Sequence, residues 1–284
     1  MKAAIQISFD FDGVLVKSPF ARCALVPALK ILARNYISRV KVRESAAFDK
    51  LKDMVMKESN RRTEAGRYVE AYDWDDVLAS VTARLNLSFD LSLVEMVRDC
   101  SSRITETQDF SLLYPDAQTT LQNLKERGAR IILLTNGLRV YQEPFLKTFG
   151  LEKYFDEVFT ADRLRSAKPQ REAFDHAFGS GSRSFGPGPR CLKVHVGDRL
   201  VVDVSGAKSA GITSVWLHRE LPDPFLLLDY QQRNNRDILE PILSNQLVYE
   251  EFSGAFESRF IPDVVIGNLK EIIPALGFLE RAAH

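Results

Sequence analysis

Cysteine is scarce in this chain of 284 residues. The three cysteines, Cys23, Cys100 and Cys191, lie far apart and form no CxxC pair. This spacing argues against a zinc site and against a disulfide framework. We therefore expect all three to be reduced, structural thiols.

Net charge and long hydrophobic runs are also absent. Lys plus Arg and Asp plus Glu both number 38, so no overall charge attracts the chain to nucleic acid or to an anionic membrane. Apolar runs such as ALVPAL and RIILLT are far shorter than the roughly 20 residues that span a bilayer. The N-terminus enters a strand pattern without a hydrophobic signal core. We expect a soluble, cytoplasmic protein without nucleic-acid or membrane partners, and its oligomeric state stays open.

Short apolar runs recur along the chain and alternate with amphipathic helical patterns. They are rich in Ile, Val and Leu and are apolar on both faces, as expected of buried strands in a parallel sheet that helices cover. The runs span residues 3–9, 129–135, 156–160, 192–197, 212–217 and 263–267. The predicted fold class is therefore α/β, with a doubly wound, Rossmann-like parallel sheet as its core.

The interval between the first two runs has no convincing strand pattern. Residues 17–112 are too many for a simple crossover and carry segments with the 3.6-residue period of amphipathic helices. We expect them to form an inserted α-helical cap domain, while residues 1–16 and 113–284 form the catalytic core. Residues 220–260 are also predicted to be helical, and they could cover the sheet edge, extend the cap or mediate dimerisation.

Polar residues follow several predicted strands directly. Asp10 and Asp12 follow the first strand, Thr135 ends the second, and Asp198 follows the strand at 192–197. The carboxyl ends of parallel strands share one crevice, which is where open α/β sheets bind ligands. Lys168, in a loop ahead of a helix, is a candidate for the same crevice.

These residue types predict the chemistry of the crevice. Converging carboxylates repel one another, and a bound divalent cation is the usual relief. Hard oxygen ligands favour Mg²⁺ over a soft transition metal. A lysine and a hydroxyl group directed at the same place suit an anionic, oxygen-rich substrate, and a phosphate ester fits all of these features.

Four segments occur in a fixed order on these elements: DFDGVL, LLTNG, AKP and GDRLVVD. They resemble the four motifs of the haloacid dehalogenase-like hydrolase superfamily, most members of which are Mg²⁺-dependent phosphatases. The resemblance covers the first strand and residues 112–217, is weak across 17–111 and is absent over 220–260. It implies a phosphatase of this superfamily with a helical cap.

The resemblance implies a role for each matching residue. Asp10 would be the nucleophile that forms an aspartyl phosphate, and Asp12 would be the general acid and then the general base. Residues i and i+2 of an extended chain point the same way, so both carboxylates can reach one phosphoryl group. Thr135 and Asn136 would bind phosphoryl oxygens, and Lys168 would neutralise charge on the aspartyl phosphate.

The resemblance also implies a ligand set for the metal. Mg²⁺ would be held by Asp10, by the backbone carbonyl of Asp12 and by Asp198. Asp203 would act nearby, through a water molecule or through Lys168.

Asp12 decides between the chemistries of the superfamily. The dehalogenase branch keeps the nucleophile but lacks the acid two residues later, so the presence of Asp12 favours phosphate chemistry. The predicted function is a Mg²⁺-dependent phosphomonoesterase that hydrolyses a small phosphorylated metabolite through an aspartyl-phosphate intermediate. Two alternatives stay open: a phosphomutase of the same superfamily and a catalytically inactive binding or scaffold member.

Two further features receive simpler interpretations. His195 alternates with valines and is expected to be a packed strand residue without chemistry. The predicted cap is locally basic, and most of its cations are expected on solvated helix faces; the alternative that one or two reach a second anionic group of the substrate stays open. These cations are Arg39, Lys41, Arg43, Arg61, Arg62 and Arg67.

Overall fold

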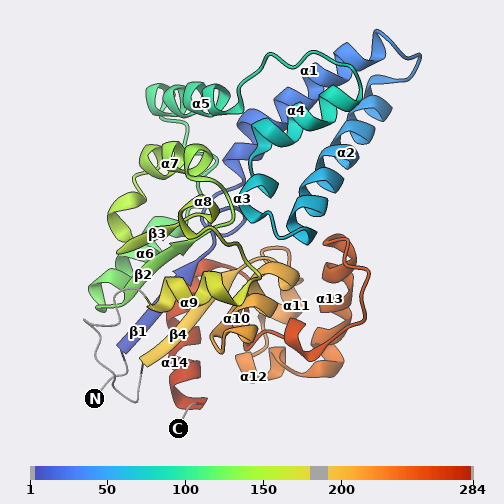
Figure 1. Ribbon diagram of the computed structural model, residues 1–284. Coiled ribbons are helices and arrows are strands. Elements are labelled where there is room, and N and C mark those ends of the chain that lie inside the picture. The colour runs from blue at the N-terminus through green and yellow to red at the C-terminus, as the bar shows by residue number, and fades with distance from the viewer. Residues whose placement is uncertain (1–3, 180–190, 283–284) are drawn as a thin grey trace.

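A six-stranded sheet with the strand order β3-β2-β1-β4-β5-β6 forms the centre of the molecule (Figure 1). The structure is a computed structural model that describes residues 4–179 and 191–282. All neighbouring strands are parallel. The strands are β1 (Ala4–Phe9), β2 (Arg130–Leu134), β3 (Glu157–Phe159), β4 (Cys191–Gly197), β5 (Thr213–Leu217) and β6 (Val264–Ile266). The predicted strands and the predicted fold class are confirmed.

Helices cover both faces of the sheet, as its doubly wound topology requires. Along β2, Ile131 packs in one apolar cluster with residues of α6 and α14, and its neighbour Ile132 packs in another with residues of α9 and α10. Successive side chains of a strand point to opposite faces, so both faces are buried. The core helices are α6 (Ala117–Glu126), α7 (Arg139–Thr148), α8 (Ala161–Leu164), α9 (Arg171–Gly179), α10 (Ser205–Ser209) and α14 (Ile272–Ala282), with short turns η2 (Glu152–Tyr154), η3 (Leu200–Val204), η4 (Ser258–Phe260) and η5 (Leu269–Glu271).

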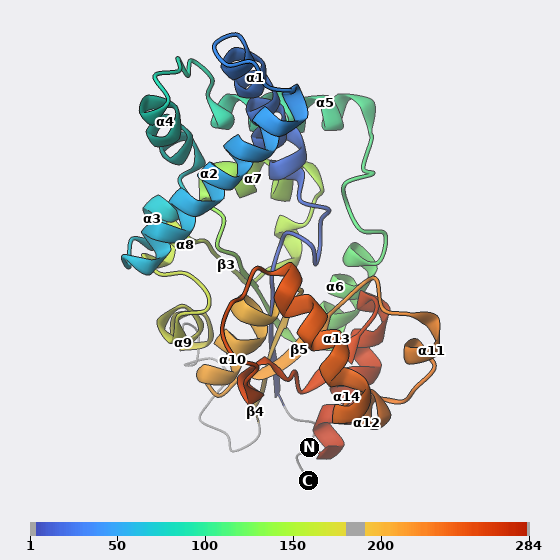
Figure 2. The ribbon, with the colours of Figure 1, turned by 90° about the vertical axis from the view of Figure 1, so that its right-hand side faces the viewer.

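Residues 220–260 form helices that cover one end of the sheet (Figure 2). Leu239, Leu243 and Leu247 recur at helical spacing and pack in one buried cluster with Trp216 of β5 and Val265 of β6. Of the three roles that the sequence left open, the structure shows the first, because this segment completes the core beside β5 and β6. Its helices are α11 (Asp223–Leu226), α12 (Tyr230–Arg233) and α13 (Arg236–Tyr249).

The chain between β1 and α6 folds into a helical cap on one side of the core (Figure 1). Its elements are η1 (Ala21–Leu25), α1 (Val26–Ile37), α2 (Glu44–Glu64), α3 (Tyr68–Ala71), α4 (Trp74–Arg84) and α5 (Leu93–Thr107). The two chain segments that join the cap to the core lie side by side, because the Lys17 amide donates to the Leu112 carbonyl at 2.8 Å and the Tyr114 amide donates to the Leu15 carbonyl at 3.1 Å. We propose that the borders of the cap lie at this pairing, with residues 17–112 on the cap side. No helix in the described part of the chain is long and apolar enough to cross a bilayer.

The expectation of three reduced cysteines is wrong for two of them. Cys23 of η1 and Cys100 of α5 form a disulfide, with their Cα atoms 5.9 Å apart, while Cys191 is a free thiol. The paired residues are separated by 77 positions in the sequence, so the absence of a local CxxC pair says nothing about them. The bond joins the first and last helical elements of the cap.

Candidate active site

The candidate catalytic residues meet at the point where the strand order reverses. Chain order proceeds from β1 to β2 and β3 on one side and then returns to β4 on the other side of β1. The crevice at such a switch point lies outside the carboxyl ends of the strands. A cleft of about 370 Å³ opens there, and its lining includes Asp10, Asp12, Thr135, Lys168 and Asp198. The structure thus brings together side chains that lie up to 188 positions apart in the numbering.

The turn after β1 directs two carboxylates into this cleft. The Asp10 amide donates to the Val196 carbonyl of β4 at 2.9 Å, which continues the sheet pairing to the end of the strand. Gly13 then adopts a φ of +80°, a conformation that favours glycine. A Cβ at this position would also lie 2.0 Å from Asp198 Oδ2, so the glycine makes room for the neighbouring carboxylate.

Lys168 links two of the buried carboxylates. Its Nζ lies 2.9 Å from Asp10 Oδ1 and 2.6 Å from Asp203 Oδ1, and its side chain is 1% exposed. Burial alone would lower the pKa of Lys168, but the charges of Asp10 and Asp203 outweigh it and raise the pKa above the ordinary value. Burial alone would likewise raise the pKa of Asp203, but Lys168 reverses the effect and lowers it. The lysine is therefore charged, and Asp203 is ionised.

His195 takes part in this arrangement, which the sequence did not suggest. It is buried in β4 as expected, but its Nε2 lies 3.1 Å from Asp203 Oδ1 and its Nδ1 lies 2.7 Å from Ser8 Oγ. Burial lowers the pKa of His195, so the ring is neutral, and Nε2–H can donate to the carboxylate while Nδ1 accepts from the hydroxyl group. The Arg199 amide donates to the second oxygen, Asp203 Oδ2, at 3.0 Å. Both oxygens of Asp203 have partners, and this residue reaches the site through Lys168.

Asp12 has a different environment from Asp10. Burial, reinforced by the charge of Asp10, raises the pKa of Asp12 to about 7. Its Oδ2 accepts a hydrogen bond from Gln142 Nε2 at 3.0 Å, whereas its Oδ1 is buried without a partner among the described residues. Because an amide N–H can only donate, a proton on Asp12 belongs on Oδ1.

Gln142 of α7 is thus a positioning residue that sequence reasoning missed. A single glutamine on a helix gives no signal by itself, and its partner Asp12 lies 130 positions away. Its side chain packs over Gly137, where an added Cβ would lie 2.0 Å from Gln142 Nε2. The glycine of the LLTNG segment therefore allows the glutamine to reach Asp12.

Asn136 holds the loop of Lys168 in place. Its side-chain oxygen accepts from the Lys168 amide, and its Nδ2 donates to the Lys168 carbonyl and to the Tyr72 hydroxyl group, each at 2.8 Å. Tyr72 belongs to the cap, so the same amide joins the cap to the core. The neighbouring Thr135 is buried at the end of β2, and its Oγ1 accepts from the Gly137 amide at 3.2 Å.

A cluster of three carboxylates marks the candidate cation site, and two of them, Asp10 and Asp198, are available to an ion. Oxygens of Asp10, Asp198 and Asp203 lie within 4.8 Å of one another. Burial raises the pKa of Asp198 well above its ordinary value, and repulsion by the negative charges of Asp203 and Asp10 raises it further. Asp198 Oδ1 is buried without a hydrogen-bond partner in the described part of the chain. An all-oxygen donor set with an unpaired buried oxygen fits a hard divalent cation such as Mg²⁺.

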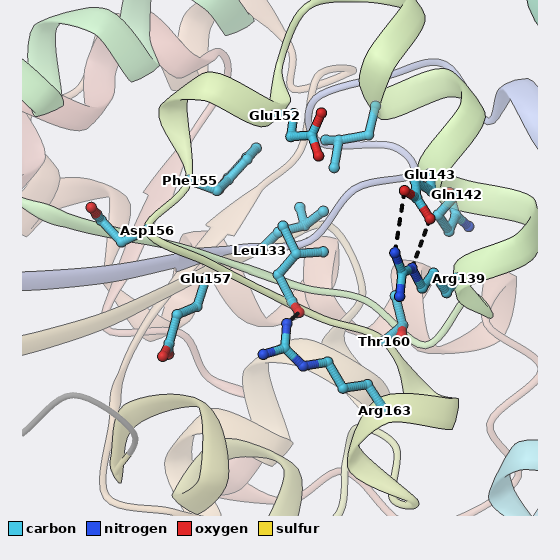
Figure 3. A pocket seen from close by; sticks show the side chains of 12 residues that line it. Leu133, Arg139, Gln142, Glu143, Glu152, Phe155, Asp156, Glu157, Thr160 and Arg163 are labelled. Atoms are coloured by element: carbon cyan, nitrogen blue, oxygen red, sulfur yellow. Dashed lines mark hydrogen bonds and ion pairs between the residues drawn. The ribbon is translucent and has the colours of Figure 1, made fainter.

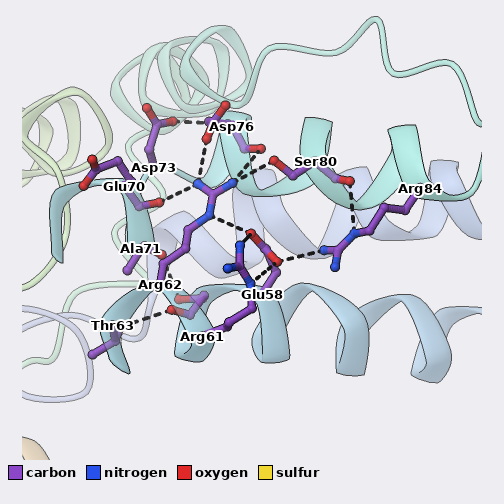
Figure 4. Close-up of polar contacts among 11 residues, drawn as sticks. Glu58, Arg61, Arg62, Thr63, Glu70, Ala71, Asp73, Asp76, Ser80 and Arg84 are labelled. Atoms are coloured by element: carbon purple, nitrogen blue, oxygen red, sulfur yellow. Dashed lines mark hydrogen bonds and ion pairs between the residues drawn. The ribbon is translucent and has the colours of Figure 1, made fainter. Parts of the chain in front are cut away.

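The cap cations do not reach the cleft. Arg62 is 3% exposed and lies inside the cap, where its Nε is 2.9 Å from Glu58 Oε1 and its Nη1 is 2.6 Å from Asp76 Oδ2 (Figure 4). Arg61 and Arg84 pair with the same glutamate. None of the six cap cations named from the sequence is among the described residues that line the cleft. The cleft thus gives no support to the alternative that one or two of them reach the substrate, and Arg62 is engaged instead by Glu58 of α2 and Asp76 of α4.

A second cavity, of about 360 Å³, lies beside the edge strand β3 (Figure 3). Its two arginines are already engaged: Arg139 pairs with Glu143 at 2.7 Å, and Arg163 donates to the Val158 carbonyl at 2.6 Å. None of the catalytic candidates lines it. The candidate residues therefore share the cleft above β1, β2 and β4 and not this cavity.

Comparisons with known proteins agree with this geometry. A family model described as haloacid dehalogenase-like hydrolase matches residues 7–211. The glyceraldehyde 3-phosphate phosphatase of Methanothermobacter thermautotrophicus is 31% identical over 131 residues, which are 45% of this chain and 55% of that protein, so the chain spans about half the length of this relative. The phosphoglycolate phosphatase of Pseudomonas fluorescens is 26% identical over 281 residues, 98% of this chain and 81% of that protein.

A solved structure of similar fold is the HAD phosphatase from Thermococcus onnurineus, which aligns with a TM-score of 0.60 at 24% identity and covers 98% of both chains. This likeness supports the arrangement of core and cap. The family model spans most of the chain and includes all seven candidate residues from Asp10 to Asp203. The chain belongs to the haloacid dehalogenase-like hydrolase family.

Proposed function

We propose that this protein is a Mg²⁺-dependent phosphomonoesterase that hydrolyses a small phosphorylated metabolite through an aspartyl phosphate on Asp10. One observation carries the proposal. Two carboxylates two residues apart share a cleft but have different partners: Asp10 is paired with the Lys168 cation at 2.9 Å, which opposes the rise in its pKa that burial causes, while Asp12 is held by the neutral Gln142 amide and its pKa is raised to about 7. A nucleophile must be ionised and a general acid must carry a proton, so the cation beside Asp10 and the raised pKa of Asp12 suit the two roles that phosphate-ester cleavage needs.

The first half-reaction uses both carboxylates. The Asp10 carboxylate attacks phosphorus, and the bond between phosphorus and the ester oxygen breaks. Asp12 gives the proton on Oδ1 to the departing alcohol oxygen, while Gln142 holds Oδ2 and so keeps Oδ1 directed toward the substrate. Lys168 stabilises negative charge beside Asp10, and the Thr135 hydroxyl group and the Asn136 backbone N–H are the donors we assign to phosphoryl oxygens.

The second half-reaction reverses the role of Asp12. Its carboxylate takes a proton from a water molecule, which attacks phosphorus and breaks the acyl–phosphate bond. Inorganic phosphate leaves, Asp10 is regenerated as a carboxylate, and Asp12 is protonated for the next cycle. We assign the cation to the carboxylates of Asp10 and Asp198 and the carbonyl of Asp12; when bound, Mg²⁺ supplies positive charge that offsets the carboxylates and the phosphoryl oxygens.

Phosphate release from a panel of phosphate esters tests the proposal. The purified protein with Mg²⁺ should release inorganic phosphate, and Asp10→Asn should abolish release. A matched control is Asp175→Asn, because Asp175 forms an exposed ion pair with Arg171 on α9. Isomerised sugar phosphate without free phosphate would indicate the phosphomutase alternative, and full activity of Asp10→Asn would rule out the proposed nucleophile.

The predicted cytoplasmic location has to be weighed against the disulfide between Cys23 and Cys100. Structural disulfides are rare in reducing compartments. The location therefore stays a prediction, and alkylation of free thiols in intact cells before extraction tests it.

A further inference from the structure

The cleft has two unlike sides. The core side supplies the carboxylates, Lys168 and Thr135, whereas the cap side is largely apolar and aromatic. The cap residues with large side chains in the lining are Phe20, Leu25, Met56, Tyr72 and Trp74. A substrate whose phosphoryl group meets the core therefore places its alcohol portion against this wall.

Three of these residues form a continuous aromatic surface. The ring centroids of Phe20 and Trp74 are 6.2 Å apart, and those of Tyr72 and Trp74 are 6.4 Å apart in an edge-on arrangement. The Tyr72 hydroxyl group is held by Asn136, so the ring is fixed relative to the phosphoryl site. Trp74 is the central ring and is only partly buried, which leaves surface for a further ring to pack on.

The cations beside this wall differ in how far they are engaged by carboxylates. Among the described residues of the lining, the cations are Lys168 and Arg199. Lys168 is engaged by Asp10 and Asp203. Arg199 Nε lies 3.7 Å from Glu250 Oε2 and its side chain is 48% exposed, so Arg199 is the less engaged of these two cations.

We propose that the cap wall formed by Phe20, Tyr72 and Trp74 binds an aromatic ring carried by the alcohol portion of the phosphate ester. The inference rests on the proposed phosphatase function and names its substrate class. A cleft of about 370 Å³ lies within the usual range for small-molecule sites. Burial of a ring against aromatic side chains gives binding energy that a short alkyl or carboxylate group does not.

Three esters with the same kind of leaving oxygen test the substrate class. Ethyl phosphate, phosphoglycolate and 2-phenylethyl phosphate all release a primary alcohol, so they differ in the group that meets the cap rather than in the bond that breaks. The expected kcat/KM for 2-phenylethyl phosphate exceeds that for each of the other two by about tenfold or more. Uridine 5′-monophosphate is a fourth test substrate. Its hydrolysis would extend the substrate class to nucleoside phosphates. No hydrolysis of it, together with good turnover of 2-phenylethyl phosphate, would restrict the substrate class to simple aryl groups.

Variants of Trp74 test the wall itself. Trp74→Ala should reduce the preference for 2-phenylethyl over ethyl phosphate to within about threefold, whereas Trp74→Phe should keep most of it. Trp74→Leu keeps apolar area without a ring and should give an intermediate ratio. The ratio within one variant is independent of the fraction of folded protein.

Two results would overturn the inference while the proposed function stands: equal or better turnover of ethyl phosphate or phosphoglycolate by the wild type, or an unchanged ratio in Trp74→Ala. Phosphate release from none of the esters would overturn the proposed function, and the inference with it.

Discussion

The two sides of the cleft are built by different physical means. On the core side, Asp10, Thr135 and Asp198 follow the ends of hydrogen-bonded strands, so the backbone of the sheet fixes where they lie. On the cap side, Phe20 and Trp74 come from helical elements whose own packing places them. In the proposed function, the sheet supplies the phosphate chemistry and the cap supplies the surface that meets the rest of the substrate.

The largest expected effect tests the core side. Lys168→Met should reduce kcat by about a thousandfold or more, because it removes the cation that stabilises charge beside Asp10. Lys147→Met, an exposed lysine of α7, is the matched control and should retain activity. Steady-state phosphate release measures the activity of both variants. An active Lys168→Met variant would contradict the claim that the core side supplies the phosphate chemistry through Lys168.

A second prediction concerns the disulfide that joins the ends of the cap. Its reduction should lower the free energy of unfolding by about 2–4 kcal/mol, because the bond closes a long loop in the unfolded chain. Denaturant unfolding with and without reductant measures this effect, with Cys191→Ser used so that the free thiol cannot exchange. Unfolded wild type without reductant should show one reactive thiol, and three would contradict the pairing.

A third prediction concerns the orientation of Asp12. Gln142→Leu should reduce kcat by about tenfold for ethyl phosphate, because Asp12 loses the hydrogen bond that directs its free oxygen to the leaving group. The loss should be smaller for 4-nitrophenyl phosphate, whose leaving group needs little protonation. An equal loss for both esters would mean that Gln142 serves the fold rather than the acid.

A fourth prediction concerns the ion pairs inside the cap. Glu58 has its pKa lowered from 4.5 to about 2, chiefly by its hydrogen bond with Arg61 against the opposing effect of burial. A lowered folded-state pKa means that the stabilisation is present above about pH 4.5 and is lost as the pH falls toward 2. The difference in Tm between wild type and Glu58→Gln should therefore shrink below pH 4.5, as thermal melts between pH 3 and 6 would show.

The matched control for this prediction is Glu44→Gln. Glu44 is on the same helix, but its pair with Arg34 is exposed at both ends. Its Tm difference should be small at every pH, and a constant difference for Glu58→Gln would contradict the assigned role of that glutamate.

The sequence predicted the core side well for a physical reason. A buried parallel strand has a readable apolar run, and the residue after it must lie at the carboxyl edge of the sheet. The residues that follow β1, β2 and β4 could therefore be assigned to one crevice from the sequence alone. The structure brings their side chains together. Their catalytic roles remain predictions.

The parts that the sequence did not predict depend on contacts between distant helices. Gln142 reaches Asp12 only because α7 packs beside the turn after β1, and Cys23 meets Cys100 only when the cap is folded. Arg62 belongs to a basic segment that suggests a solvated face, but it is buried beside Glu58. Helical periodicity in the sequence predicts which face of a helix is buried, but it does not predict which other element packs against that face.

The most direct test of the central claim is to trap the aspartyl phosphate. With 4-nitrophenyl phosphate, Asp12→Asn can still be phosphorylated, since the leaving group departs without an acid, but it lacks the base that activates water for the second step. After acid quenching, peptide mass spectrometry should find a phosphoryl group on the peptide that contains Asp10, and the double variant Asp10→Asn, Asp12→Asn should carry none. A phosphoryl group on another residue, or turnover by Asp12→Asn at the wild-type rate with no adduct, would contradict the account.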